Sequence, residues 1–467
     1  MERRPSCCVQ RVAKPIRRQT IANSKHVPVR ATLHKLFRAE FLTALAKSTG
    51  AMVRQRKIAP VELFWTVVLG FGLGRQRSLA GLRRAFEKST GTTVEESSFY
   101  DRFNAGFAKM LKQAAAHALD HGVGVRRALQ GQLAGFRDVV LTDSTVVRLH
   151  DLLKKAYPGS RTNHSKAALK AHWIMSVSGA GKHSVRLTPG RRHDGPVFQV
   201  GKWVASKLLM FDLGYFRYQL FDCIARNGGY FLSRLKASAN PLIVSENLKH
   251  RGQARSLVGQ RVWDCVRGLQ RETLDVMVRV DFKRRSYAGK ASIGTTLFRV
   301  VGLRDASSGE YHLYVTNVPA DRLTAEQVQS TYALRWQIEL LFKELKRHYH
   351  LEEMPSANPH VVEALLHAAI VTLVVSRALL EVVRQQLGAS AERTPTQRWA
   401  AVLEAVAADV LEIATTAIRR SRDLAARIGR VLLHEALDPN AGRLPLLPTV
   451  ETGIHSYRPR LRSPGHA

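Results

Sequence analysis

The sequence predicts an α/β protein in which a sheet-forming centre is flanked by helical regions. Three patterns support this fold class. Between about 136 and 240, short apolar runs alternate with helix-like stretches, as in a sheet covered by helices. Between about 240 and 318, apolar and polar residues alternate, which predicts further strands. Helical periodicity dominates residues 31–130 and the chain after 324.

The N-terminal part divides into a basic arm, 1–30, and a helical region, 31–130. The arm has no apolar period, and it could lie along phosphates or be a disordered tail without a role. In the helical region, Pro60 and Ser78 mark helix starts. The basic faces of these short helices suit a DNA-binding module, and a plain helical packing domain is the alternative. The basic residues of the arm are Arg3, Arg4, Arg11, Lys14, Arg17, Arg18, Lys25 and Arg30.

Residues 131–390 are expected to form the central domain. Strands are predicted at 138–143, 173–177 and 184–187, and a helix-like stretch at 197–206 precedes a buried strand at 208–211. Asp143 and Asp212 each follow an apolar run in which a charge is expensive to place. Because carboxylates at the ends of neighbouring strands converge, the two side chains are expected to meet. A capping role is the common fate of a single Asp in such a position.

A β-rich insertion is expected at about 240–318, within this central domain. From Thr324 the chain is predicted to be helical to about 436, with a break near Gly388, so that 391–467 forms a helical C-terminal region and a tail. The apolar stretch 364–376 is shorter than the roughly 20 residues of a membrane span. It is predicted to be a buried core helix, and no membrane association is expected.

The charge of the chain points to a polyanionic partner. Lys and Arg number 72 against 37 Asp and Glu, a formal net charge of +35. Nucleic acid is the leading partner class, and a solvated basic surface without a ligand is the alternative. The four cysteines show no C-x-x-C spacing and the N-terminus has no secretory pattern, so we expect a reducing cytoplasm.

The helix after residue 324 has the strongest pattern. Thr324 and Gln327 have capping-box spacing. Positions around the helix axis advance by about 100° per residue. If Tyr332 is set at 0°, Arg335, Glu339 and Lys346 fall at about 300°, 340° and 320°, so all four share one face of the helix. An adjacent apolar stripe would pack on the sheet; its members are Leu334, Ile338, Leu341 and Leu345. Taken alone, Glu339 could also simply pair with a neighbouring cation on a solvated surface.

Three carboxylates, Asp143, Asp212 and Glu339, would suit Mg²⁺ or Mn²⁺. These are hard cations that prefer oxygen ligands and retain waters for substrate phosphate. Two such ions can promote in-line displacement at phosphorus.

The spacing Tyr332-x2-Arg335-x3-Glu339-x6-Lys346 resembles the Y-R-E-K signature of the insertion-sequence-four family of bacterial DDE transposases. Leu141 to Thr145 and Phe211 to Phe216 resemble that family's first and second aspartate blocks, with Arg234 and Lys236 following. The resemblance covers about 135–350. It implies a ribonuclease-H-like core interrupted by the β-rich insertion.

The resemblance also implies function. Asp143, Asp212 and Glu339 would bind two metal ions and carry out catalysis, while Tyr332, Arg335 and Lys346 would contact phosphates near the cleaved end. The expected reaction is cut-and-paste movement of an insertion sequence, by strand cleavage and 3′-hydroxyl strand transfer. The expected partners are double-stranded element ends and target DNA, bound by a homodimer in the cytoplasm at the nucleoid.

Two other functions remain open from the sequence. One is an inactive or repurposed sequence-specific DNA-binding protein, and the other is a nuclease of the same fold without strand transfer. Cutting and joining use the same chemistry. An assay of strand transfer is therefore needed to separate the nuclease from the transposase.

Overall fold

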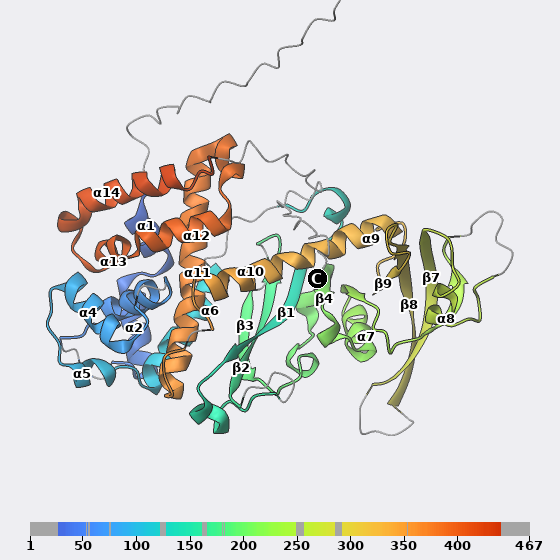
Figure 1. Ribbon diagram of the computed structural model, residues 1–467, viewed down its shortest axis with the longest axis horizontal. Coiled ribbons are helices and arrows are strands. Elements are labelled where there is room, and N and C mark those ends of the chain that lie inside the picture. Colours follow the sequence, from blue (N-terminus) through green and yellow to red (C-terminus); the bar gives the residue numbers. More distant parts are fainter. Residues whose placement is uncertain are drawn as a thin grey trace, which may run out of the picture.

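The computed structural model describes residues 27–439 except for 53, 55–56, 74–75, 122–127, 161–165, 180, 182, 249–255, 285–291 and 353. Most of the predicted basic arm and the end of the predicted tail therefore lie outside the described residues. A body of helices stands beside a long sheet, with helices α9 (Ala325–Tyr332) and α10 (Trp336–Arg347) running across the sheet (Figure 1).

Within the described residues, nine strands form one sheet in the order β3-β2-β1-β4-β5-β9-β8-β7-β6. Strands β1, β4 and β5 are parallel to one another, and the other neighbours are antiparallel. The predicted strands after 136 are confirmed, although most are longer than expected. Their bounds are β1 Asp138–Arg148, β2 Ala168–Ser176, β3 Ser184–Pro189, β4 Lys207–Phe211, β5 Tyr230–Arg234, β6 Leu242–Glu246, β7 Thr273–Lys283, β8 Ile293–Arg304 and β9 Tyr311–Thr316.

The two faces of the sheet belong to two hydrophobic cores. Along β1, Val139 and Leu141 lie in the larger core and Val140 lies in the smaller one, because successive side chains of a strand point to opposite faces. Helix α10 covers the first face. Helix α7 (Tyr218–Arg226) covers the second, where the Phe221 ring stacks on Phe231 at 4.3 Å.

The strands at 240–318 extend the central sheet instead of forming a separate one. Strand β9 pairs with β5, placing Leu232 opposite Thr316, and the short helix α8 (Val262–Val266) packs beside the outer strands. The Arg299 guanidinium donates to both oxygens of Asp275, at 2.9 and 2.6 Å, and to the carbonyls of Val318 and Leu323. This buried ion pair ties the outer strands to the start of α9.

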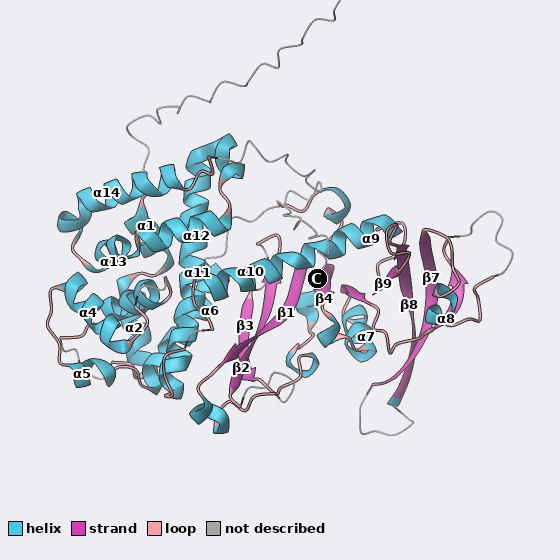
Figure 2. Cartoon of the chain, in the orientation of Figure 1, coloured by secondary structure: helices cyan, strands magenta, loops and turns pink. Residues whose placement is uncertain are grey.

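The helices before and after the sheet form one body around a shared core (Figure 2). Helix α11 lies at its centre, where Thr372 donates to the Val68 carbonyl at 2.6 Å. Gly72 permits this approach, because a Cβ there would collide with Thr372. The helices are α1 Val29–Leu36, α2 Ala39–Thr49, α3 Pro60–Trp65, a π-helical turn Thr66–Phe71, α4 Leu79–Thr90, α5 Glu96–Tyr100, α6 Ala105–His121, α11 Pro359–Leu387, α12 Thr396–Ala405, α13 Ala407–Thr415 and α14 Ile418–Glu435.

Helix α11 confirms the predicted buried core helix. By length and composition it could cross a membrane, but 78% of its most apolar window is buried inside the protein, as expected for a core helix. The helix-like stretch predicted at 197–206 is wrong. Two short 3-10 turns, Gly195–Val197 and Lys202–Val204, occupy this region, because Pro196 and Gly201 leave no uninterrupted run long enough for a stable helix.

Candidate active site

The sheet brings Asp143 and Asp212 together at one point. Thr142 on β1 lies opposite Phe211 on the parallel strand β4, so the residues that follow them, Asp143 and Asp212, are neighbours. Asp212 comes directly after the last residue of β4, as predicted. Asp143 does not end its strand: β1 continues to Arg148 in pairing with β2 alone. Asp143 therefore sits where β4 stops and β1 loses its second neighbour.

The third predicted carboxylate comes from the helix that crosses the sheet. Thr324 caps α9 in the predicted capping box with Gln327. The helix is not uniform, because a 3-10 turn, Ala333–Arg335, separates α9 from α10. Glu339 lies in the first turn of α10. The predicted apolar stripe is confirmed as buried; its members are Leu334, Ile338, Leu341 and Leu345.

Arg335 occupies the space between the three carboxylates. Its guanidinium lies 3.1 Å from Asp143 Oδ2 and 2.5 Å from Glu339 Oε1, and 4.0 Å from Asp212 Oδ1. Asp143 and Arg335 are each only 15% exposed, whereas Asp212 is 43% exposed. One cation is thus shared by three anions. Solvent reaches this cluster from the side of Asp212, the most exposed of the three carboxylates.

Burial and the neighbouring charges shift the pKa values of Asp143 and Arg335. Burial raises the pKa of the Asp143 carboxyl from 3.8 to about 6, although the Ser144 N–H and Arg335 oppose the increase. Burial alone would lower the pKa of Arg335, but its interactions with Tyr332 and with the three carboxylates outweigh burial, and the pKa is raised. Such perturbed groups are common at functional sites.

Tyr332 is buried behind the carboxylates. Its hydroxyl donates to the carbonyl of Phe211 at 3.1 Å, and burial raises its pKa to about 12. The Arg335 guanidinium lies 5.7 Å from the Tyr332 ring centre. Tyr332 therefore holds the backbone immediately before Asp212, and its contact with DNA stays a prediction.

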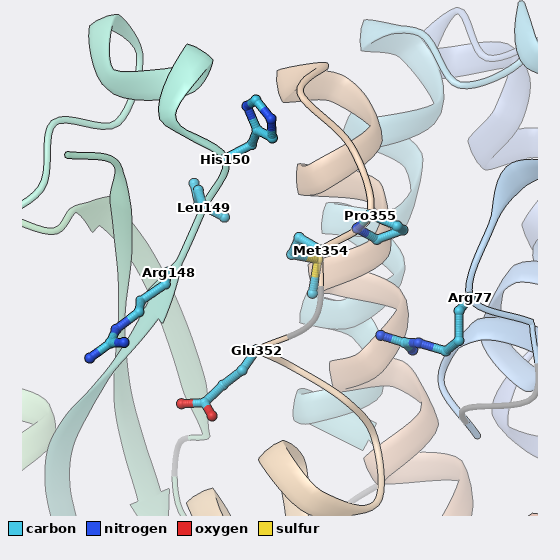
Figure 3. Close-up of a pocket in the computed structure, with 7 residues that line it drawn as sticks. All are labelled: Arg77, Arg148, Leu149, His150, Glu352, Met354 and Pro355. Atoms are coloured by element: carbon cyan, nitrogen blue, oxygen red, sulfur yellow. The ribbon is translucent and has the colours of Figure 1, made fainter. Parts of the chain in front are cut away.

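Lys346 lies about two turns beyond Glu339 and pairs with Glu352 at 2.5 Å. Glu352 lines a cavity of about 400 Å³ between the end of β1, the α10–α11 connection and the helical body (Figure 3). Arg77 and Arg148 also line it. This cavity is adjacent to the signature lysine and does not contain the three carboxylates.

A polar network beside Asp143 was not predicted from the sequence. Ser144 donates its hydroxyl to Asp194 at 2.8 Å, and the Lys170 ammonium lies 3.2 Å from the same carboxylate oxygen. Burial lowers the pKa of the nearby His172 to about 4, so this imidazole is neutral at pH 7. Asp194 comes from a turn remote in sequence, and only the tertiary fold shows that it reaches Ser144.

The donor set can be tested for its fit to metal ions. Among the residues that the structure describes, no three His, Cys, Asp or Glu side chains form a group close enough to hold a metal ion. The guanidinium of Arg335 stands where such a cation would neutralise Asp143 and Glu339. The chemistry of the site, oxygen donors around a positive charge, fits Mg²⁺ or Mn²⁺, provided that Arg335 moves.

Comparisons with known proteins identify similar sequences. The Transposase DDE domain family matches residues 134–375. A transposase for insertion sequence element IS231F from Bacillus thuringiensis subsp. israelensis is 22% identical over an alignment of 396 residues, which covers 76% of this chain and 80% of that protein. The putative transposase InsL for insertion sequence element IS186A from Escherichia coli (strain K12) is 40% identical over 70 residues, or 15% of this chain and 19% of that protein. A cryo-EM structure of a piggyBac transposase synaptic complex with hairpin DNA has a TM-score of 0.43 and 9% identity, and covers 88% of this chain and 86% of that one.

Proposed function

Since this chain belongs to the DDE transposase family, we propose that Asp143, Asp212 and Glu339 are the catalytic carboxylates with which it cuts and joins DNA. The protein is a DNA transposase. The observation that carries the residue assignment is the convergence of three carboxylates, from β1, from the end of β4 and from α10, on the single guanidinium of Arg335.

The three carboxylates would hold two Mg²⁺ or Mn²⁺ ions once Arg335 leaves them. When bound, such a pair supplies activation of the attacking oxygen and stabilisation of the leaving oxygen at phosphorus. In the structure Arg335 offsets the mutual repulsion of the carboxylates. After release, its planar fork is suited to bind a DNA phosphate next to the cleaved bond.

The other signature residues have separate roles in this proposal. Tyr332, through the Phe211 carbonyl, keeps the end of β4 in place and so positions Asp212. When DNA binds, Lys346 leaves Glu352 and pairs with a DNA phosphate instead. The exchange is possible because both partners are anions and because the other contacts of the bound duplex hold the phosphate close to Lys346. The predicted phosphate contact of Tyr332 would require its hydroxyl to leave Phe211.

The domain assignment follows from the same proposal. Strands β1 to β5, in the order β3-β2-β1-β4-β5, form the ribonuclease-H-like core of the catalytic domain, 131–390, and β6 to β9 form its β-rich insertion. The helices within 31–130 bind DNA, and 391–467 is the C-terminal region. The protein acts as a homodimer on element ends and target DNA, in the cytoplasm at the nucleoid.

Cleavage of linear DNA that contains the native element ends tests the function. Wild type, Glu339→Gln and the control Glu412→Gln, which changes an exposed glutamate of α13, are compared with Mg²⁺, with Mn²⁺ and with EDTA. We expect end-specific cutting and joining to target DNA that require metal and are lost only in Glu339→Gln. Cutting without joining would support a nuclease, and binding without cutting in either metal would support a repurposed DNA-binding protein.

A further inference from the structure

Helix α14 (Ile418–Glu435) lies on the outer side of the helical body (Figure 1), and its sequence places a stripe of arginines along one face. With Arg419 at 0° and about 100° per residue, Arg430, Arg427 and Arg420 fall at about 20°, 80° and 100°. All four side chains are exposed. The buried residues Ser421, Ile428 and Leu432 fall near 200°, on the opposite side of the helix.

The side chains of these arginines have no partner among the residues that the structure describes. None of the four guanidinium groups takes part in an ion pair, a hydrogen bond or a ring contact there, and the hydrogen bond of Arg420 to the Ala417 carbonyl comes from its backbone N–H. Asp423 falls at about 40° in the same stripe; its side chain is exposed and has no partner among the described residues. Four like charges on one helix face repel one another and gain nothing from internal pairing, so the stripe suits an external polyanion.

We propose that the α14 stripe, Arg419, Arg420, Arg427 and Arg430, binds the phosphate backbone of double-stranded DNA at a surface separate from the three carboxylates. This inference rests on the proposed transposase function, which makes duplex DNA the polyanion that the protein meets. The sequence predicts DNA binding by the helices of residues 31–130, and α14 lies outside that region.

The dimensions of the stripe match a DNA backbone. Arg419 and Arg430 are eleven residues apart, which corresponds to about 16 Å along the helix. Phosphates of one strand follow one another at about 3.4 Å along the duplex axis, so the stripe spans about five of them. All basic residues of α14 other than His434 are arginine, whose planar fork binds a phosphate through two hydrogen bonds.

Helix α14 is also held firmly in place. The Arg30 guanidinium donates to the Thr416 carbonyl at 2.5 Å and to the Ser421 hydroxyl at 2.6 Å, next to the start of α14. The Val27 N–H donates to the Gly429 carbonyl. A fixed helix presents its cations without an ordering cost on binding, which favours affinity.

The test uses the full-length protein and two fluorescent 40-base-pair duplexes, one with a native element end and one of unrelated sequence. The variant with Arg419, Arg420, Arg427 and Arg430 changed to Gln is compared with wild type and with Arg422→Gln, an exposed arginine that lies about 60° outside the stripe. The slope of log affinity against log salt concentration should fall by about 3 to 4 in the stripe variant, at about 0.9 per phosphate contact. The loss of affinity should be similar for both duplexes, because backbone contacts do not specify sequence.

A second variant is expected to gain DNA affinity instead of losing it. Asp423→Asn removes the one acidic residue of the stripe, so affinity for both duplexes should increase about threefold or more at low salt. Phenylglyoxal modification of the wild type should show protection of the stripe arginines by DNA and no protection of Arg422.

The outcomes separate this inference from the proposed function. A stripe variant with an unchanged salt slope, an Asp423→Asn variant without a gain, or stripe arginines that DNA does not protect would each overturn the inference. If such a protein still cuts element ends with metal, the transposase proposal stands. A wild type that binds neither duplex would overturn both.

Discussion

Asp143 is the residue whose change should separate stability from activity. Its carboxyl is buried among Arg335, Asp212 and Glu339, and its pKa is raised from 3.8 to about 6 by burial above all. An Asp143→Asn variant keeps the shape of the side chain, and its amide oxygen can still accept the Ser144 N–H. We therefore expect it to fold more stably than the wild type at neutral pH and to be inactive.

The magnitude follows from the pKa. Below about pH 4 the carboxyl is protonated in both the folded and the unfolded protein, so it contributes no difference. Above about pH 6 the carboxyl is charged in both states, and the full free-energy cost of burying that charge then destabilises the folded protein. Each pH unit between the two pKa values corresponds to about 1.4 kcal/mol, so the free energy of unfolding of the wild type loses about 3 kcal/mol from this group as the pH rises from 4 to 6.

Urea denaturation followed by tryptophan fluorescence, in EDTA, measures this difference. At pH 7.5 the free energy of unfolding of Asp143→Asn should exceed that of the wild type by about 2 to 3 kcal/mol, and the two proteins should converge near pH 4. Addition of Mg²⁺ should stabilise the wild type and not the variant, because a ligand stabilises only the form that binds it. The reasoning is refuted if the variant is no more stable at pH 7.5, or if its advantage persists unchanged at pH 4.

Three further changes probe the site and its support. Glu339→Gln should reduce the cleavage rate about a thousandfold or more, the scale of losing a group that acts only in the transition state, without weakening DNA binding; a rate within tenfold of wild type would exclude Glu339 as a ligand. Glu352→Gln frees Lys346, so affinity for element ends should increase about threefold, and an unchanged affinity in low-salt fluorescence anisotropy would place Lys346 off the DNA. Asp275→Asn leaves Arg299 buried without its anion, so the free energy of unfolding in urea should fall by about 3 to 5 kcal/mol. The double variant Asp275→Leu with Arg299→Met should recover most of that free energy. Equal losses in the single and double variants would contradict this.

Local sequence signals were sufficient for much of the architecture. Pro60, Ser78 and Thr324 each start a helix as predicted, and the Ser78 side chain accepts the Gly81 N–H. These signals work because caps and proline act on the backbone within one turn. The apolar run before Asp212 likewise predicted both the buried strand and the place where it ends.

Features that depend on distant neighbours could not be predicted in this way. The apolar run before Asp143 ends there, but the strand continues because β2 supplies its hydrogen-bonding partners. The contact of Ser144 with Asp194 joins residues fifty positions apart. The helix calculation placed Tyr332 beside Arg335, Glu339 and Lys346 on one face, whereas the 3-10 turn changes the angle between them and Tyr332 is buried.

The shared core of the helical body has a consequence for synthesis of the chain. Helices α1 to α6 leave the ribosome early, but α11, on which α1, α6 and the π-helical turn Thr66–Phe71 pack, follows only after residues 122–358 have been made. At about 5 to 20 residues per second, this delay lasts roughly 10 to 50 seconds. During that time the apolar faces of α6 and of the π-helical turn Thr66–Phe71 have no permanent cover, so a nascent chain that stalls before α11 would expose a surface suited to chaperone capture or aggregation.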